Sequence, residues 1–313
     1  MVVGSIIFKE IIKRGYAESD SGRVWDIANM SFLHLTSEMA KGYLNLKEHP
    51  RYKATVVDIE IDLLKKHSAN FLKCVENCQF NLIDFGCSDG LKAKVVIESL
   101  SKEMKFRYCP VSVNKYSVDL AFENVKKGDY ENVKDYAPRV SDSLRTIGEI
   151  GSALRNSRYQ KNVTLLLGSL LGSFQINHYL FGLSRSMFPG DVLIIGNGVR
   201  KGERFANLET YKHPIFHNWF VHLLKELGFT EEEIEYDARF NNDRVEGFYK
   251  IKVDKEIESE GNKIQFKKGD EVIVAVVYKY YEKELEKFCK MYFPEVRLVS
   301  DVEKESALVF CRR

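Results

Sequence analysis

Short apolar runs alternate with helix-patterned segments in this sequence, and this alternation constrains the fold more than any other feature. The apolar runs cover residues 80–85, 106–113, 163–167 and 191–195. The helical patterns cover residues 55–77, 91–102, 117–126 and 178–187. Strands that alternate with helices are typical of βαβ units and a mostly parallel sheet. We therefore predict an α/β fold, with the strand ends and any ligand along one edge of the sheet.

The rhythm changes after Gly198. A strong helix is expected at 217–227, and residues 263–266 and 271–277 are expected to form antiparallel strands around the turn 267–270. A helix at 282–292 and a strand at 307–311 close the chain. These patterns predict a Rossmann-type sheet domain made of residues 53–200 plus 263–313. Residues 1–52 plus 201–262 are expected to form a second, smaller α+β lobe.

Composition narrows the class of protein. Hydrophobic residues make up 44% of the 313 residues and charged residues 29%, which suits a globular core with a soluble surface. The formal net charge is only +2, so nothing indicates nucleic acid as a partner. No apolar run approaches the ~18–20 residues that span a bilayer, and the N-terminus is a poor signal peptide. We expect a cytoplasmic protein that does not bind membranes; the sequence leaves its oligomeric state open.

No metal site is expected. The six cysteines include no CxxC pair, and Cys74 and Cys78 have no Cys/His cluster nearby, so ordinary reduced thiols are the better interpretation. His213 and His217 are four residues apart, but Pro214 lies between them. They are interpreted as a loop and a helix start.

A glycine-containing loop follows the run at 80–85. It has the pattern Asp84-x-Gly86-x-Ser88-x-Gly90 and precedes a predicted helix. Glycine permits positive φ and close backbone approach, and such loops place nucleotide-like cofactors at a helix N-terminus. Taken alone, the loop fits either a nucleotide-like cofactor or a structural turn.

The end of the second predicted strand is where a cofactor ribose would bind, usually through an acidic residue. Only Ser112 and Asn114 are available there, and both can hydrogen-bond hydroxyl groups. Asp142 is a candidate for the adenine edge, and an exposed turn or helix-cap aspartate is an equal alternative.

The third predicted strand and the segment after it resemble a known family. Two stretches carry the resemblance: Gly168-Ser169 followed by Gly172 and Phe174, and Pro189-Gly190-Asp191 followed by Gly196. They are similar to the "LGS-x-IGNF" and "PGD-x-LL-x-G" patterns of the histidine-specific, S-adenosylmethionine-dependent methyltransferases. Further matches are Lys92, Pro110-Val111, residues 266–271, Lys279-Tyr280 and Tyr52. The similarity covers most of residues 50–313.

The resemblance implies a Rossmann-type class I methyltransferase sheet that binds S-adenosylmethionine and releases S-adenosylhomocysteine, with a lobe that caps the substrate. The implied cofactor-binding residues are Asp84, Gly86, Ser88, Gly90, Lys92, Ser112, Asp142, Gly168 and Ser169. The implied substrate-binding residues are Tyr52, Ser173, Gly247, Ala275 and Val277. Tyr211 is a further candidate for contact with the acceptor; for Tyr52 and for Tyr211, surface or core packing is the alternative interpretation. No catalytic base is identified, because an amine acceptor needs only to lose its proton before attack.

Departures from the family pattern concern the acceptor. The family's substrate-binding asparagine is Ser173 here, and its "E-x-S" pair, which holds the imidazole, falls on Ala275 and Val277. Gly247 replaces a methionine, and Ser112 replaces an aspartate. A site that loses its hydrogen-bonding groups loses discrimination for a polar substrate. We therefore expect an acceptor that is bulkier or less polar than free histidine.

Three hypotheses follow. The first is a methyltransferase that N-methylates a small amino-containing acceptor other than free histidine. The second is a catalytically inactive protein of the same fold that binds the cofactor, another ligand or a partner. The third, a nucleotide-dependent oxidoreductase, would need an acid at the end of the second strand, and Ser112 stands there instead.

Overall fold

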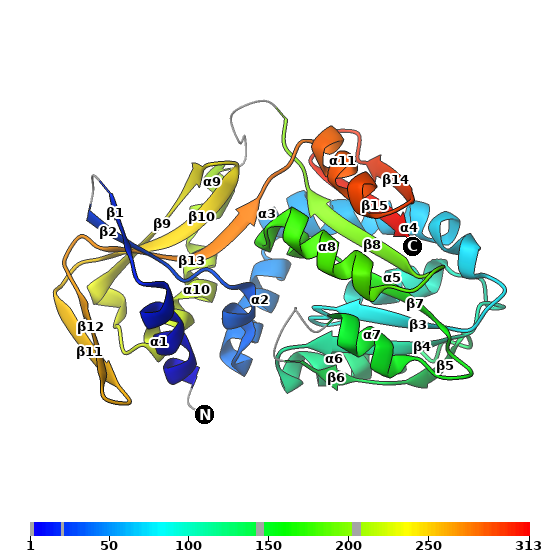
Figure 1. Ribbon diagram of the computed structural model, residues 1–313, viewed down its shortest axis with the longest axis horizontal. Helices are drawn as coiled ribbons and strands as arrows, with labels where there is room; N and C mark the ends of the chain where they lie inside the picture. The colour runs from blue at the N-terminus through cyan, green and yellow to red at the C-terminus, as the bar shows by residue number, and fades with distance from the viewer. Residues whose placement is uncertain (1–2, 20–21, 142–146, 202–207) are drawn as a thin grey trace. The chain divides into compact units, whose positions relative to one another are not determined.

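The computed structural model describes residues 3–19, 22–141, 147–201 and 208–313. The chain divides into two compact units (Figure 1). Unit 1 consists of Met1–His49 and Phe205–Tyr278, and unit 2 of Pro50–Arg204 and Lys279–Arg313. Among the described residues, none of the helices combines the length and apolar character needed to cross a membrane.

Unit 2 is built on an eight-stranded sheet of order β14-β15-β8-β7-β3-β4-β5, with β6 beside β4. Its strands are β3 (Phe80–Phe85), β4 (Phe106–Ser112), β5 (Val133–Tyr136), β6 (Arg139–Val140), β7 (Lys161–Leu166), β8 (Val192–Gly198), β14 (Glu295–Ser300) and β15 (Ser306–Arg312). Strands β3 to β8 pair in parallel, whereas β15 is antiparallel to both β8 and β14. The predicted, mostly parallel sheet is therefore confirmed.

Helices cover both faces of this sheet (Figure 1). They are α4 (Asp58–Leu72), α5 (Leu91–Ser99), α6 (Lys115–Lys126), α7 (Ile147–Leu154), α8 (Ile176–Ser186) and α11 (Glu282–Tyr292), with the short turns α3 (Pro50–Tyr52), η2 (Lys53–Val57), η3 (Lys73–Val75) and η5 (Leu170–Ser173). Helix α5 packs against both α4 and α6, and α8 packs against both α7 and α11. This is a doubly wound, Rossmann-like arrangement.

The direction of winding reverses at β3. The chain runs from β3 outward to β4 and β5, and then returns to add β7 on the other side of β3. The loops after β3 and β7 therefore diverge at a topological switch point, where open α/β sheets bind their ligands. This is the edge of the sheet that carries the glycine loop and the Gly168-Ser169 pair.

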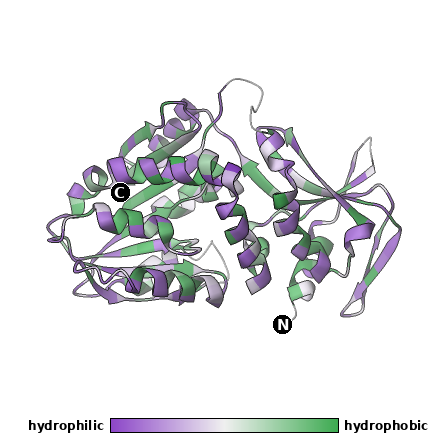
Figure 2. Cartoon of the chain, turned by 180° about the vertical axis from the view of Figure 1, so that it is seen from behind, coloured by the Kyte–Doolittle hydropathy of each residue, from purple (hydrophilic) through white to green (hydrophobic). Residues whose placement is uncertain are grey.

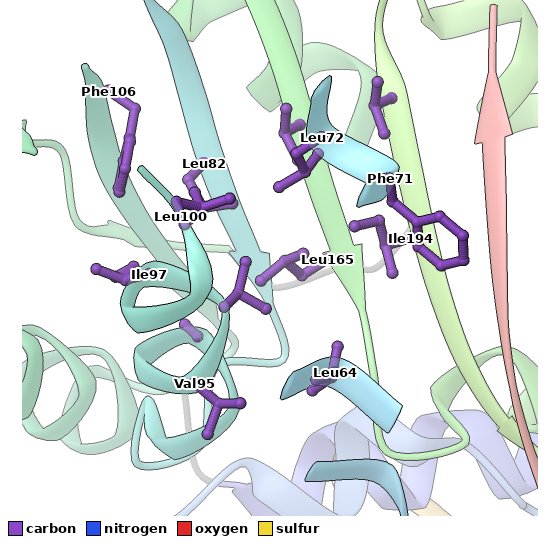
Figure 3. Close-up of a cluster of buried hydrophobic side chains, with 14 of the residues drawn as sticks. Leu64, Phe71, Leu72, Leu82, Val95, Ile97, Leu100, Phe106, Leu165 and Ile194 are labelled. Carbon is purple, nitrogen blue, oxygen red and sulfur yellow. The ribbon is translucent and has the colours of Figure 1, made fainter. Parts of the chain in front are cut away.

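The core of unit 2 explains why the apolar runs are strands. Leu82, Leu165 and Ile194 project from β3, β7 and β8 onto Leu64 of α4 and Val95 of α5 (Figure 3). All five are at most 7% exposed. Burial of each aliphatic side chain contributes about 1.5–3 kcal/mol. In Figure 2 the helices carry hydrophobic and hydrophilic residues in alternation, as amphipathic helices do.

Unit 1 contains a five-stranded sheet of order β1-β2-β13-β10-β9. Its strands are β1 (Ala17–Ser19), β2 (Gly22–Asp26), β9 (Ile234–Asn241), β10 (Arg244–Ile251) and β13 (Glu271–Tyr278), and a separate hairpin comprises β11 (Lys255–Ser259) and β12 (Asn262–Phe266). Its helical elements are α1 (Val3–Arg14), η1 (Met30–His34), α2 (Ser37–Glu48), α9 (Leu208–Tyr211), α10 (Pro214–Glu226) and η6 (Glu231–Glu233). Helices α2 and α10 pack together, and Gly42 allows close approach to Trp219.

The predicted hairpin around residues 267–270 is wrong. Strand β12 pairs with β11, and β13 pairs with β10 and β2 instead. The physical reason is burial: the first six residues of β13 are buried without alternation, so this strand is central and needs a partner on each side. Residues 263–278 therefore lie outside the sheet of unit 2, whereas the predicted last strand joins it as β15, beside β14, a strand that the sequence patterns did not predict.

Candidate functional site

The loop after β3 is a sharp turn that requires glycine. Gly86, Ser88 and Gly90 have φ values of 73°, 51° and 75°. A Cβ on Gly86 would lie 3.1 Å from Leu170 Cδ2, and one on Gly90 would lie 3.1 Å from the backbone of Ala121. Gly86 thus lets the loop after β3 approach the segment after β7, and Gly90 lets α5 begin close to α6.

Asp84 stands at the base of this loop and is only 5% exposed. Its Oδ2 accepts a 2.8 Å hydrogen bond from the hydroxyl of Tyr108 on β4. Burial, reinforced by the Asp84 charge, raises the pKa of Tyr108 well above its usual value. Tyr108 therefore stays protonated and continues to donate to the buried carboxylate.

Two buried serine hydroxyls lie at the switch point. Ser88 Oγ in the loop after β3 and Ser173 Oγ in η5 have no hydrogen-bond partner within the described ranges. Buried polar atoms are nearly always hydrogen-bonded, so these two hydroxyls keep a hydrogen-bonding capacity that a polar ligand could use. Together with the left-handed glycine loop, they fit a nucleoside-type cofactor.

Lys92, in the first turn of α5, is paired with a buried acidic side chain. Its ammonium forms an ion pair with Glu60 of α4, and the side chains are 13% and 3% exposed. Glu60 in turn accepts the backbone N–H of Gly168 at 2.8 Å. The lysine that the resemblance assigned to the cofactor therefore connects the loop after β3 with the loop after β7.

Gly168 and Ser169 also adopt left-handed conformations, with φ values of 74° and 60°. The backbone N–H of Ser169 donates to Gly196 O at 3.0 Å, and Ser169 Oγ accepts the N–H of Gly198 at 2.9 Å. The Ser169 hydroxyl thus holds the end of β8, and the remaining polar groups of this turn lie at the carboxyl edge of the sheet.

The predicted ribose position is the end of β4. Ser112 is half-buried there, and its carbonyl accepts the N–H of Ser141 at 2.9 Å. Asn114 caps α6 by accepting the N–H of Ser117 at 2.9 Å. Val111 pairs with Phe85, so this strand end lies beside the glycine loop. Asp142, the predicted adenine contact, lies outside the described residues.

The predicted substrate residues fall into two groups. Tyr52 and Ser173 belong to unit 2, whereas Tyr211, Gly247, Ala275 and Val277 belong to unit 1. Tyr52 is half-buried and ends α3, directly before the π-helical turn η2. Such π-turns are frequent at functional sites.

Three residues of the unit 1 group lie on one face of its sheet. Gly247 of β10 is opposite Ala275 of β13, and Val277 is opposite Val245, so these small and apolar residues share a face. A Cβ on Gly247 would lie 3.0 Å from Phe220 of α10 and 3.3 Å from the hydroxyl of Tyr236.

Tyr236 connects this face to another predicted substrate residue. Its hydroxyl donates a 2.8 Å hydrogen bond to the carbonyl of Tyr211. Burial raises the pKa of Tyr236, so the hydroxyl stays protonated. We refer to Tyr211, Phe220, Tyr236, Gly247, Ala275 and Val277 as the unit 1 face.

Sequence reasoning missed two residues near the switch point. One is Glu60, which could have been noticed because it lies three and four residues before the buried Leu63 and Leu64, on the apolar side of α4. The other is Tyr179 of α8. Its ring stacks on Phe174 at 4.2 Å, and its buried hydroxyl has no hydrogen-bond partner among the residues that the structure describes.

The described parts of the chain contain no group of three or more His, Cys, Asp or Glu side chains arranged to hold a metal ion. All six cysteines are free thiols. Burial raises the pKa of Cys87, next to the glycine loop, well above its usual value, so this thiol is not activated as a nucleophile.

The sheet order and the left-handed glycine loop at the switch point define a Rossmann-like α/β fold, the fold of the class I methyltransferases. The profile of the family described as "Histidine-specific methyltransferase, SAM-dependent" matches residues 43–313. The chain belongs to this family, so the resemblance is confirmed and the oxidoreductase hypothesis is set aside. No curated protein sequence matches the chain.

Several solved structures resemble this one. They include the CurJ carbon methyltransferase, at 12% identity over 80% of this chain and 53% of that chain, with a TM-score of 0.43. A putative O-methyltransferase from Nostoc punctiforme PCC 73102 is 10% identical over 99% and 83% of the two chains, with a TM-score of 0.46. The DhpI–SAM–HEP complex is 9% identical over 89% and 99%, with a TM-score of 0.41. The chain spans about half the length of the CurJ chain.

Proposed function

We propose that this chain binds S-adenosylmethionine at the loops after β3 and β7 and N-methylates a small amino-containing acceptor other than free histidine. The cofactor proposal is supported by the SAM-dependent family and by the orphaned Ser88 hydroxyl in the glycine loop. Gly86, Ser88 and Gly90 would hold the cofactor from the loop after β3. Gly168 and Ser169 would hold it from the loop after β7, and Ser112 and Asp142 from the segments that follow β4.

When bound, the cofactor supplies an electrophilic methyl group and departs as S-adenosylhomocysteine. The acceptor amine loses a proton to solvent, its nitrogen forms the new N–C bond, and the S–C bond breaks. The protein's task is to align the amine and to exclude water, because proximity supplies much of the rate. Left-handed turns with many internal hydrogen bonds suit that task, since they hold their geometry before the ligand arrives.

The observation that carries the acceptor proposal is the unit 1 face. The resemblance places the family's "E-x-S" pair on Ala275 and Val277, and Gly247 lies directly opposite Ala275. These three residues have no hydrogen-bonding side-chain groups, and Phe220 and Tyr236 lie next to Gly247. We propose that unit 1 forms the acceptor-binding lobe and that this face contacts an amine with a larger, less polar side chain than imidazole.

A methyl-transfer screen tests the proposal. The full chain is incubated with methyl-labelled S-adenosylmethionine and with each amino acid, a set of biogenic amines and a small-molecule cell extract. Transfer to an aromatic or aliphatic amine at a higher kcat/KM than to histidine is the expected result. Efficient transfer to free histidine would overturn the acceptor proposal.

Calorimetry with S-adenosylhomocysteine separates the cofactor claim from the acceptor claim. Binding without transfer to any acceptor would favour an inactive, cofactor-binding member of the family. No heat of binding at high micromolar concentration would overturn the cofactor proposal itself. Gly86→Arg provides the matched negative control, because the substituted side chain would fill the loop.

A further inference from the structure

Glu60 places a negative charge inside unit 2. The residue is 3% exposed, and its carboxylate accepts the backbone N–H of Gly168 at 2.8 Å through Oε1 and at 3.2 Å through Oε2. A buried carboxylate is costly unless it is both paired and hydrogen-bonded. The N–H of Gly168 supplies the hydrogen bond and fixes the first residue of the left-handed turn after β7.

Lys92 supplies the opposite charge. Its ammonium, in the first turn of α5, forms an ion pair with the same carboxylate. Lys92 follows the glycine loop by two residues, whereas Gly168 belongs to the loop on the opposite side of the switch point. One side chain from α4 therefore contacts both the start of α5, just after the glycine loop, and the loop after β7.

The neighbouring strand leaves space for this carboxylate. A Cβ on Gly196 of β8 would overlap Glu60 Oε1, so any side chain there would displace the carboxylate. The φ of Gly196 is not among the positive values, so the glycine is required here by contact and not by backbone conformation. Three chain segments therefore converge on one buried charge.

We infer that Glu60 is a positioning residue for cofactor binding: it sets the Gly168-Ser169 turn and the Lys92 ammonium in one arrangement before the cofactor arrives. This inference rests on the proposed function for the cofactor, and it gives Glu60 no contact with the reacting atoms. Lys92 and Gly168 lie in different segments of the predicted site. Because both contact Glu60, the position of each one depends on the other.

The chain offers a matched control at the opposite edge of the same sheet. Asp191 is 1% exposed, forms an ion pair with Arg155 and accepts the N–H groups of Asn162 at 2.9 Å and Phe188 at 2.8 Å. It precedes β8 and therefore lies at the amino end of the strands, away from the loops after β3 and β7. Like Glu60, it is a buried carboxylate that forms an ion pair and accepts backbone N–H groups, but it lies at the other end of the strands.

The first test measures the Kd of S-adenosylhomocysteine by calorimetry for the wild type, Glu60→Ala, Glu60→Gln and Asp191→Asn. The Ala variant should raise the Kd about tenfold or more, because hydrogen bonds to charged groups contribute this much. The Gln variant keeps an acceptor for Gly168 but loses the ion pair, so its Kd should lie between those of the wild type and the Ala variant. Asp191→Asn should change the Kd by less than about twofold while lowering thermal stability.

The second test needs no ligand. Amide hydrogen exchange in the segment 164–175 should accelerate in Glu60→Ala and stay near the wild-type rate in Asp191→Asn. Equal effects of the Glu60 and Asp191 variants on both readouts would overturn the inference, because both would then be general stabilisers. If the wild type itself fails to bind S-adenosylhomocysteine, the proposed function fails, and unchanged exchange at 164–175 in Glu60→Ala would overturn the role of Glu60 separately.

Discussion

The loops of unit 2 and the face of unit 1 were both predicted to bind ligands, and they are built from opposite chemistry. Around the switch point, buried charges are satisfied in detail: Glu60 by Lys92 and Gly168, and Asp84 by Tyr108. On the unit 1 face, the residues that the resemblance places at the family's imidazole-binding positions are the apolar Ala275 and Val277.

This difference predicts how strictly each region selects its ligand. Polar groups that depend on the ligand for a partner, such as the Ser88 hydroxyl, reject a ligand that leaves them unsatisfied, often by several powers of ten. An apolar wall discriminates mainly by volume, at about 1–3 kcal/mol for each methylene group. The chain should therefore be strict toward its cofactor and permissive among acceptors of similar size.

The largest expected effect concerns cofactor binding at the glycine loop of unit 2. Gly86→Arg should weaken S-adenosylhomocysteine binding by at least about 100-fold, because the new side chain adds backbone strain at positive φ and overpacks the loop against Leu170. Calorimetry measures the loss. Gly261→Arg is the matched control, since Gly261 also has positive φ but has nothing within 4 Å of its Cβ position. Wild-type affinity in Gly86→Arg would show that the cofactor does not use this loop.

The second effect concerns the selectivity of the unit 1 face for the acceptor. The double variant Ala275→Glu, Val277→Ser restores the family's imidazole-binding residues and should raise kcat/KM for free histidine about 10-fold to 100-fold, the value of a charged hydrogen bond. Methyl-transfer kinetics with histidine measure the gain. The control double variant Ala275→Gln, Val277→Ser has a side chain of the same size as glutamate but without the charge. Its kcat/KM for histidine should rise less. An unchanged preference would mean that this face does not contact the acceptor.

A smaller effect should follow from displacing Glu60 without removing it. Gly196→Ala places a methyl group where the Glu60 carboxylate lies and should weaken S-adenosylhomocysteine binding about tenfold. Gly182→Ala in α8 is the matched control, because nothing lies within 4 Å of that position. Its Kd should stay constant, and its stability should rise by up to about 1 kcal/mol from helix propensity. Equal Kd values for the two variants would argue against the positioning role.

The smallest effect concerns alkaline pH. Because the pKa of Tyr108 is raised in the folded chain, ionisation of this tyrosine favours unfolding. The stability that the protonated Tyr108 contributes is fully present below the unfolded pKa of about 10 and is lost as pH rises toward the folded pKa. Tyr108→Phe should therefore reduce the decline of unfolding free energy above pH 10 by up to about 1.4 kcal/mol per pH unit. Urea unfolding at pH 8, 10 and 11 measures the slopes. Parallel slopes in the two proteins would show that Tyr108 titrates normally.

Much of unit 2 could be predicted from local patterns. The apolar runs at 80–85 and 106–113 became β3 and β4, because strands buried on both faces need little information beyond hydrophobicity and length. The same reasoning failed for β13. Its apolar pattern correctly indicated a strand, but strand partners depend on the whole sheet, so β13 joined β10 and β2.

At the glycine loop, too, local patterns predicted the backbone turn but not the contacts between residues that are distant in the sequence. The spacing of Gly86, Ser88 and Gly90 predicted a tight turn, since few residues tolerate positive φ. Glu60 lies 24 residues before Asp84 in the sequence, on a helix whose pattern indicated only packing. No local signal could show that its carboxylate would receive both Lys92 and the N–H of Gly168.

The sequence by itself therefore determined the strand and helix pattern, the glycine turn and the family, because these depend on residue type and spacing along the chain. Only the tertiary structure decided which groups meet: Glu60 with Lys92 and Gly168, and Gly247 with Ala275. The physical reason is that a buried charge or a cross-strand pair takes its energy from neighbours that are distant in sequence, and the fold alone brings those neighbours together.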